Sequence, residues 1–220
     1  MPGRGTAKVA VMVATPNGSG STRQTKHEKV QKTMGLTKLE NNAALVVIDL
    51  QKGMLSAPTV HPLDEIVRNA ANLAAAFRRQ GHPVMLVNVA GGAPRRTEIT
   101  RPVITRTPDW TDLVDELDVQ PEDHLVTKMR WGAFYGTSLD AQLKELGVTQ
   151  VVLAGVSTSA GVESTARSAH EHGYHVVLVK DAMTDRDAEA HRNSIERIFP
   201  KLGETTTTTE VLAMLGAPGA

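Results

Sequence analysis

The sequence predicts one α/β domain built on a parallel sheet, and three observations support this prediction. From residue 43 onward, short runs of β-branched residues alternate with longer amphipathic patterns, which is typical of parallel α/β proteins. The chain has 220 residues, which is long enough to bury one sizeable core. No internal repeat is visible, so a repeat architecture is not indicated.

Five strands are expected in the apolar runs of this region. They cover residues 43–48, 83–89, 124–127, 151–154 and 174–179. The first run is apolar at every position, which suits a strand that is buried on both faces of a sheet.

Helices are predicted between these runs from apolar residues at 3.6-residue spacing. The clearest pattern covers residues 66–77 and stops at Gly81, which suits a helix with a C-terminal glycine. A second helix is expected to begin at Thr137 and to end at Gly147. Three further helical stretches are predicted, over residues 159–172, 187–199 and 209–215.

Residues 1–38 differ from the rest of the chain in composition and charge. They carry seven Lys or Arg residues against one acid, Glu28, whereas the rest of the chain carries 17 basic and 23 acidic residues. The segment is rich in Gly, Ser, Thr and Gln, and it has no apolar period that would bury a face. We therefore expect a basic, disordered tail over 1–38 and the folded domain over 39–220. Met34 is an alternative start of the native chain.

The overall composition excludes several classes of protein. Lys and Arg together number 24, as do Asp and Glu, so no net charge favours nucleic acid or an anionic membrane as a partner. No run approaches the ~20 apolar residues of a membrane span. The absence of cysteine excludes disulfide scaffolds, thiolate zinc sites and a cysteine nucleophile. We expect a cytoplasmic protein that binds a small-molecule substrate.

Polar residues follow the predicted strands. Asp49 follows the first strand, Asn88 lies near the end of the second, and Lys128 follows the third. Residues 155–158 follow the fourth strand and Asp181 follows the fifth. The carboxyl ends of parallel strands share one edge of a sheet, so these residues are expected to lie together. A role as a cap or turn former is the simpler interpretation of Asp181, whereas Asp49 and Lys128 end apolar runs, where a buried ion must be paired.

Four motifs in order carry a family resemblance. They are ALVVIDLQ over 44–51, K-x-RWGAF-x-x-T-x-L over 128–139, GVST-x-x-GVESTAR over 155–167 and DAM over 181–183. Over roughly residues 39–216, the chain resembles the isochorismatase-like (cysteine hydrolase) family. The resemblance implies a three-layer α/β/α sandwich around a six-stranded parallel sheet, which is a Rossmann-like arrangement, and a homodimer or homotetramer.

The resemblance also implies roles for three residues. In the amide-hydrolysing members, Asp49 would be the base, Lys128 would orient it, and position 161 would hold the nucleophilic cysteine. Here that position is Gly161, which has no atom with which to attack a carbonyl. The pattern with glycine at this position resembles that of isochorismatases proper and of a related group of uncharacterised hydrolases. Isochorismatases cleave a vinyl ether without a covalent intermediate. Asp49 would then be the general acid, if burial raises its pKa against the pull of Lys128, a balance that the sequence does not decide.

Gly161 also has a structural interpretation, because a glycine in the first turn of a helix lets the helix pack closely on the sheet. The two interpretations are compatible. The backbone amides of residues 159–161 are expected to face the site, where the helix dipole favours an anion. The resemblance further implies a cis peptide bond between Val156 and Ser157.

The remaining site predictions concern substrate binding. Trp131 and Phe134 are expected to wall the pocket, with core packing or a subunit contact as the alternative. Arg95 lies in the long loop after the second strand and would clamp an anionic substrate, unless that loop is simply solvated. Further substrate-binding residues are expected at the strand ends and at the start of the following helix: Asn88, Ser157, Thr158 and Ala160.

Two other functions and the metal question stay open at this point. A non-catalytic ligand-binding or oligomeric relative is one alternative, and amide hydrolysis by a water activated by Asp49 is the other. We expect no metal and no cofactor, since the histidine that related nicotinamidases place close after their first metal-binding Asp is not evident. A cluster of His170, His172 and His175 is expected to be solvent-exposed or to cap a helix.

Overall fold

A six-stranded parallel sheet forms the centre of the domain, with strand order β3-β2-β1-β4-β5-β6. The computed structural model describes residues 35–54, 58–92, 96–98 and 106–216. The strands are β1 (Ala43–Ile48), β2 (Val84–Val89), β3 (His124–Lys128), β4 (Gln150–Val156), β5 (His175–Thr184) and β6 (Glu204–Thr206). This order is that of Rossmann-type folds, and the chain reverses its direction of travel across the sheet between β1 and β4.

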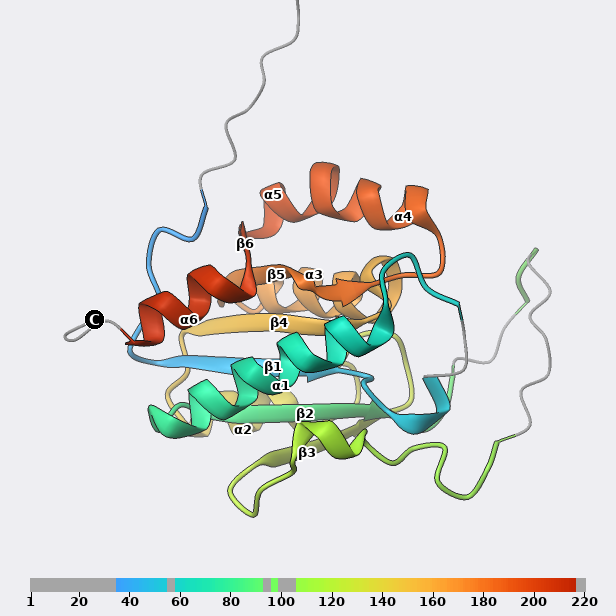
Figure 1. Cartoon of the computed structure of the whole chain (residues 1–220), viewed down its shortest axis with the longest axis horizontal. Coiled ribbons are helices and arrows are strands. Elements are labelled where there is room, and N and C mark those ends of the chain that lie inside the picture. The colour runs from blue at the N-terminus through green and yellow to red at the C-terminus, as the bar shows by residue number, and fades with distance from the viewer. Residues whose placement is uncertain (1–34, 55–57, 93–95, 99–105, 217–220) are drawn as a thin grey trace, which may run out of the picture. The chain divides into compact units, whose positions relative to one another are not determined.

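Helices cover both faces of the sheet, which confirms the predicted three-layer α/β/α sandwich (Figure 1). One face packs against α1 (Leu63–Arg79) and α6 (Thr208–Gly216). The other packs against α2 (Leu139–Glu145), α3 (Glu163–Glu171) and the helical segment that ends in α5. That segment comprises α4 (Ala188–Asn193), a π-helical stretch (Ser194–Ile198) and α5 (Phe199–Leu202).

The central strands explain why the sequence shows little alternation. Every residue of β1 and of β4 is buried, because each strand has neighbours on both edges and helices on both faces. Leu45 and Val47 point into the core beneath α1, whereas Val46 and Ile48 point into the core beneath α3. The centre of the sheet is therefore apolar on both sides between the ends of these two strands.

The predicted strands and helices are present, and the main differences lie at their ends. β5 continues to Thr184, so Asp181 lies inside the strand and not after it. Its carboxylate accepts hydrogen bonds from Thr208 N at 2.7 Å and Thr208 Oγ1 at 3.0 Å, which caps the start of α6. β6 is the strand that the apolar runs did not reveal. It is a three-residue edge strand of Glu and Thr that pairs with β5 and, among the described residues, with no other strand.

The packed chain begins before residue 39. Leu36 is buried in the core beneath α1, and Thr37 donates to the carboxylate of Glu204 from its amide at 3.1 Å and from its hydroxyl at 2.5 Å. Residues 35–38 therefore belong to the domain, although their composition had placed them in the tail. The rest of the predicted tail lies outside the described residues. Among the helices that are described, none has the length and apolar character needed to cross a membrane.

Candidate active site

The candidate site lies where β1 and β4 end side by side, at the point where the strand order reverses. Ile48 at the end of β1 is in register with Gly155 of β4, so Asp49 and the segment after β4 are neighbours. In open α/β sheets, ligands bind at this position, outside the carboxyl ends of the strands. Lys128 ends β3, and its long side chain spans the intervening strand β2 to reach Asp49.

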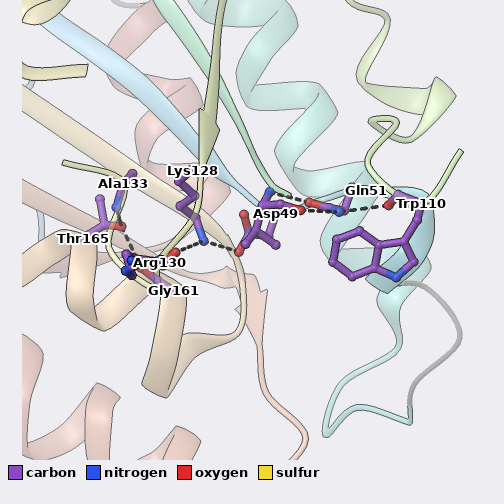
Figure 2. A network of polar contacts seen from close by, with 9 residues as sticks. Asp49, Gln51, Trp110, Lys128, Arg130, Ala133, Gly161 and Thr165 are labelled. Atoms are coloured by element: carbon purple, nitrogen blue, oxygen red, sulfur yellow. Dashed lines mark hydrogen bonds and ion pairs between the residues drawn. The ribbon is translucent and has the colours of Figure 1, made fainter. Parts of the chain in front are cut away.

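Asp49 and Lys128 form a buried ion pair (Figure 2). Lys128 Nζ lies 2.6 Å from Asp49 Oδ2, and the two residues are only 1% and 4% exposed. The same Nζ donates a second hydrogen bond, to the carbonyl of Arg130 at 3.1 Å. The predicted pairing is therefore present, and the ammonium group is held by two acceptors.

The other carboxylate oxygen of Asp49 is unsatisfied. Within the described part of the chain, Oδ1 is buried and has no hydrogen-bond partner. Burial raises the pKa of Asp49 to about 6, and this effect outweighs the opposing attraction of Lys128. About one tenth of the carboxyl groups would then carry a proton at pH 7. The balance that the sequence left open is decided by burial.

The backbone holds Asp49 in an uncommon conformation. Its φ is +53°, in the left-handed region, while its amide donates to Val87 O at 2.8 Å and its carbonyl accepts from Gln51 N at 2.9 Å. The first of these bonds ties the turn after β1 to β2, and the second closes the turn itself. The side chain of Asp49 is thereby aimed at Lys128 instead of into the core.

Gly161 lies directly against Asp49. A Cβ atom added at position 161 would lie 3.3 Å from Asp49 Oδ2, 3.0 Å from Ile48 Cγ2 and 3.0 Å from the carbonyl oxygen of Val156. A side chain at this position would therefore point at the carboxylate, as a nucleophile paired with Asp49 should. The space is also tight, so close packing of the helix start on the sheet is an equally valid reason for the glycine.

The turn that connects β4 to α3 is the segment from Ser157 to Val162, and it carries two further constraints. The Val156–Ser157 peptide bond is cis, as the resemblance implied. Before it, Gly155 has φ +115°, and a Cβ there would lie 2.0 Å from Ile48 O, so only glycine fits. A π-helical stretch over Thr158–Val162 then leads into α3. We call this segment the β4–α3 turn.

The backbone amides of this turn are less available than predicted. Ser159 N donates to Asp185 Oδ2 at 2.7 Å, and Ala160 N donates to Ser157 O at 3.1 Å. Two of the three amides that were expected to receive an anion therefore already have acceptors. Ala160 also lacks a polar side chain, so its predicted contact with substrate stays a prediction.

The other predicted binding residues are only partly brought to the site. Asn88 donates to Thr111 O at 2.8 Å and so holds a loop, while Thr158 is fully buried and contacts His191. Phe134 is a core residue, because it is buried and stacks on His172 with ring centroids 5.0 Å apart. His172 follows the C-terminal end of α3, so the ring of Phe134 packs beside that end of the helix, and its predicted role as a wall of the pocket stays a prediction. Trp131 is half exposed.

Arg95 lies outside the described residues, and the structure gives no position for it. The predicted histidine cluster is on the surface, as expected. His170 contacts Leu202 O, His172 lies 3.4 Å from Asp140, and His175 lies 3.7 Å from Glu40. Over the part of the chain that is described, no group of three or more His, Asp or Glu side chains is arranged to hold a metal ion.

Sequence reasoning missed four residues beside the site. Gln51 is fully buried and clamps the end of β2, because its Oε1 accepts from Val89 N at 2.7 Å and its Nε2 donates to Trp110 O at 2.9 Å (Figure 2). Trp110 packs against Gly53 and beneath Arg106. Asp185 and His191 hold the β4–α3 turn. Only Gln51 had a sequence signal, as the last residue of the first motif.

Comparison with known proteins agrees with this geometry. The isochorismatase domain model matches residues 43–210. An uncharacterised isochorismatase family protein of Escherichia coli O157:H7, YecD, is 42% identical over 80% of this chain and 100% of its own. Maleamate amidohydrolase of Pseudomonas putida is 28% identical over 78% of this chain and 86% of its own.

A solved structure supports the same conclusion. An isochorismatase family protein from Burkholderia thailandensis superposes with a TM-score of 0.78 at 40% identity, covering 81% of this chain and 98% of that one. The sheet order, the paired Asp49 and Lys128 and these matches agree with one another. The chain belongs to the isochorismatase family.

Proposed function

We propose that this protein is a hydrolase of a small molecule in which Asp49 donates a proton to the substrate and no covalent intermediate forms. The observation that carries the proposal is the state of Asp49. The residue is buried, its Oδ1 has no partner among the described residues, and its pKa is raised to about 6. A carboxyl group with such a pKa is a usable general acid near neutral pH.

Position 161 determines which reaction this acid can serve. With Gly161 in place of a nucleophile, no acyl-enzyme can form at this position, and a reaction that needs only an acid and a water fits best. Hydrolysis of a vinyl ether is such a reaction. Asp49 protonates the terminal alkene carbon, water adds to the resulting oxocarbenium ion, and the proton that water loses returns to the carboxylate. The hemiketal then collapses to an alcohol and a ketone.

Lys128 would position Asp49 and tune its acidity in this scheme. Its Nζ fixes Oδ2 at 2.6 Å, which leaves Oδ1 as the oxygen that can exchange a proton with substrate. The ammonium group also compensates the negative charge that Asp49 acquires when it releases its proton. A general acid of this kind accelerates a reaction ~10²- to 10⁴-fold, and positioning supplies the rest.

Amide hydrolysis by an activated water is the second candidate function. The same carboxylate would be the base, and the ionised form of Asp49 is the major one at pH 7. The relative named maleamate amidohydrolase favours this candidate. Gly161 counts against it, because the amide carbonyl would have to be attacked by water without a covalent step.

Product analysis and a pH profile would separate the two candidates. Purified protein is incubated with isochorismate and, separately, with maleamate, and the release of pyruvate and of ammonia is measured from pH 4.5 to 8.5. If Asp49 is the acid, pyruvate appears and kcat falls as pH rises through about 6, because the protonated form is lost. If Asp49 is the base, ammonia appears and kcat falls as pH drops through about 6. Neither product, together with measured ligand binding, would favour a non-catalytic relative.

A further inference from the structure

The β4–α3 turn is held from outside by two residues that the proposed reaction does not use. Asp185 Oδ2 accepts two hydrogen bonds from Ser159, from its amide at 2.7 Å and from its hydroxyl at 2.8 Å. His191 Nδ1 lies 2.9 Å from Thr158 Oγ1. Thr158 and Ser159 follow the cis peptide bond, so the contacts with Asp185 and His191 hold the first residues of the turn.

These two anchors are buried and come from separate elements. Asp185 follows β5 and is 6% exposed, while His191 lies in α4 and is 9% exposed. Among the ion pairs of the described residues, none includes Asp185. Its second oxygen accepts from Arg186 N at 2.7 Å, so hydrogen-bond donors, and not a counter-ion, compensate this buried carboxylate.

The opposite side of the same turn packs against Asp49. Gly161, two residues after Ser159, lies so close that a Cβ there would be 3.3 Å from Asp49 Oδ2 and 3.0 Å from Ile48 Cγ2. The turn is therefore fixed between the end of β1 on one side and the two anchors on the other. Any outward shift of the turn would open space beside Asp49 Oδ2.

We propose that Asp185 and His191 are positioning residues that keep the β4–α3 turn packed against Asp49. This inference rests on the proposed role of Asp49 as the acid. Neither residue touches the reacting carboxyl group, and both act through Thr158 and Ser159. With the anchors removed, water would reach Asp49, and the burial that favours its protonated form would weaken.

The test measures the pKa of the Asp49 carboxyl group directly, by ¹³C NMR of the full-length protein with labelled aspartate. The Asp49 signal is assigned from its loss in Asp49→Asn. Asp185→Ala is expected to lower the pKa of Asp49 toward the ordinary value of a carboxyl group and to lower kcat about tenfold, with KM changed less than twofold. A merely structural role of Asp185 would leave the pKa of Asp49 in the folded protein unchanged.

Matched variants control for general damage. Asp187→Ala removes the cap of α4 in the same segment, where Asp187 accepts from Glu189 N and Ala190 N, and is expected to leave both readouts unchanged. His191→Ala should behave like Asp185→Ala. His191→Asn should restore the wild-type values, because its amide can replace Nδ1 beside Thr158.

The inference is overturned if folded Asp185→Ala and His191→Ala proteins keep the wild-type pKa of Asp49. If Asp185→Ala fails to fold, Ser159→Ala takes its place in the test. That variant removes the hydrogen bond from the Ser159 hydroxyl to Asp185, and an unchanged pKa of Asp49 would then overturn the inference. Absence of turnover in the wild type would count against the proposed function alone, since the NMR comparison needs no substrate.

Discussion

Two buried ion pairs lie at opposite ends of the strands, one at the carboxyl ends and one at the amino ends. They differ in how many hydrogen bonds their carboxylates accept. At the carboxyl edge, Asp49 has Lys128 on one oxygen and no partner for the other within the described residues. At the amino edge, Asp123 lies just before β3 and meets Arg78 at the end of α1. Arg78 donates to both of its oxygens, at 2.9 and 2.7 Å, and Gln120 N adds a third bond at 2.8 Å.

The difference teaches that burial of a charge does not by itself mark a functional site. The side chain of Asp123 is 1% exposed, yet both of its oxygens are bonded. These bonds hold the start of β3 to the end of α1 and to the turn at Gln120. The side chain of Asp49 is also buried, at 6% exposed, but one of its oxygens has no partner among the described residues and its pKa is raised to about 6. We propose that the unsatisfied oxygen, placed where the strand order reverses, distinguishes a reactive carboxyl group from a structural one.

The largest expected effect separates the two pairs by activity. Asp49→Asn should lower kcat at least ~100-fold, because an amide cannot donate the required proton. Asp123→Asn removes the charge of the other pair and should leave kcat within about twofold of the wild type. Steady-state kinetics on whichever substrate is turned over would measure both. An Asp49→Asn enzyme of normal activity would remove Asp49 from the mechanism.

The second prediction concerns the pH dependence of stability. The folded-state pKa of Asp49 lies above its unfolded value of 3.8, so its contribution is fully present below pH 4 and is lost as pH rises through about 6. The free energy of unfolding of the wild type should therefore fall by about 3 kcal/mol across this window relative to Asp49→Asn. Urea titrations at several pH values would measure it. A constant difference between the two proteins would contradict the raised pKa.

The third prediction concerns the ion pair of Asp123, whose loss should affect stability and not activity. Asp123→Asn should cost about 2 kcal/mol, because the Arg78 guanidinium loses its charged partner while it stays largely buried. Urea unfolding at pH 7 would show the loss, and the unchanged kcat of the same variant serves as the internal control. If stability is unchanged, Arg78 finds another acceptor, and its bond to Leu117 O at 3.0 Å is the first place to look.

The smallest expected effect comes from adding one carbon beside Asp49. Gly161→Ala places a Cβ 3.0 Å from Ile48 Cγ2 and from Val156 O, which should cost about 1 kcal/mol of stability after the better helix propensity of alanine is counted. Gly132→Ala is the matched control, since its Cβ would make ordinary contacts of 3.4 Å or more with Ser164. Thermal unfolding of both variants would show whether the space at Gly161 is as tight as the geometry indicates.

Much of the fold could be predicted from the sequence, because the spacing of apolar residues and the length of the apolar runs indicate the strands and helices. The first five strands and the helix over residues 66–77 follow from hydrophobic pattern alone. The sixth strand could not be found in this way, since Glu204, Thr205 and Thr206 have no apolar run. Its place in the sheet depends on pairing with β5, which is a tertiary property.

The ion pair of the candidate site could be predicted from the sequence, but the residues that support the β4–α3 turn could not. Asp49 and Lys128 were found because ions at the ends of apolar strands need each other. Asp185 was missed because β5 runs past Asp181, and nothing local in the sequence marks where a strand stops. His191 reaches Thr158 from a helix 33 positions further along the chain, and periodicity does not reveal such a contact.

The closeness of Gly161 to Ile48 also limits how this protein can be redesigned. In a Gly161→Cys variant made to obtain an acyl-transfer enzyme, the Cβ atom alone would lie 3.0 Å from Ile48 Cγ2 and from the Val156 carbonyl oxygen. We therefore expect the two positions to be epistatic, so that the effect of a change at 161 depends on the residue at 48. A library that varies them together, with smaller or unbranched side chains at 48, can reach sequences that a search through single mutants passes by.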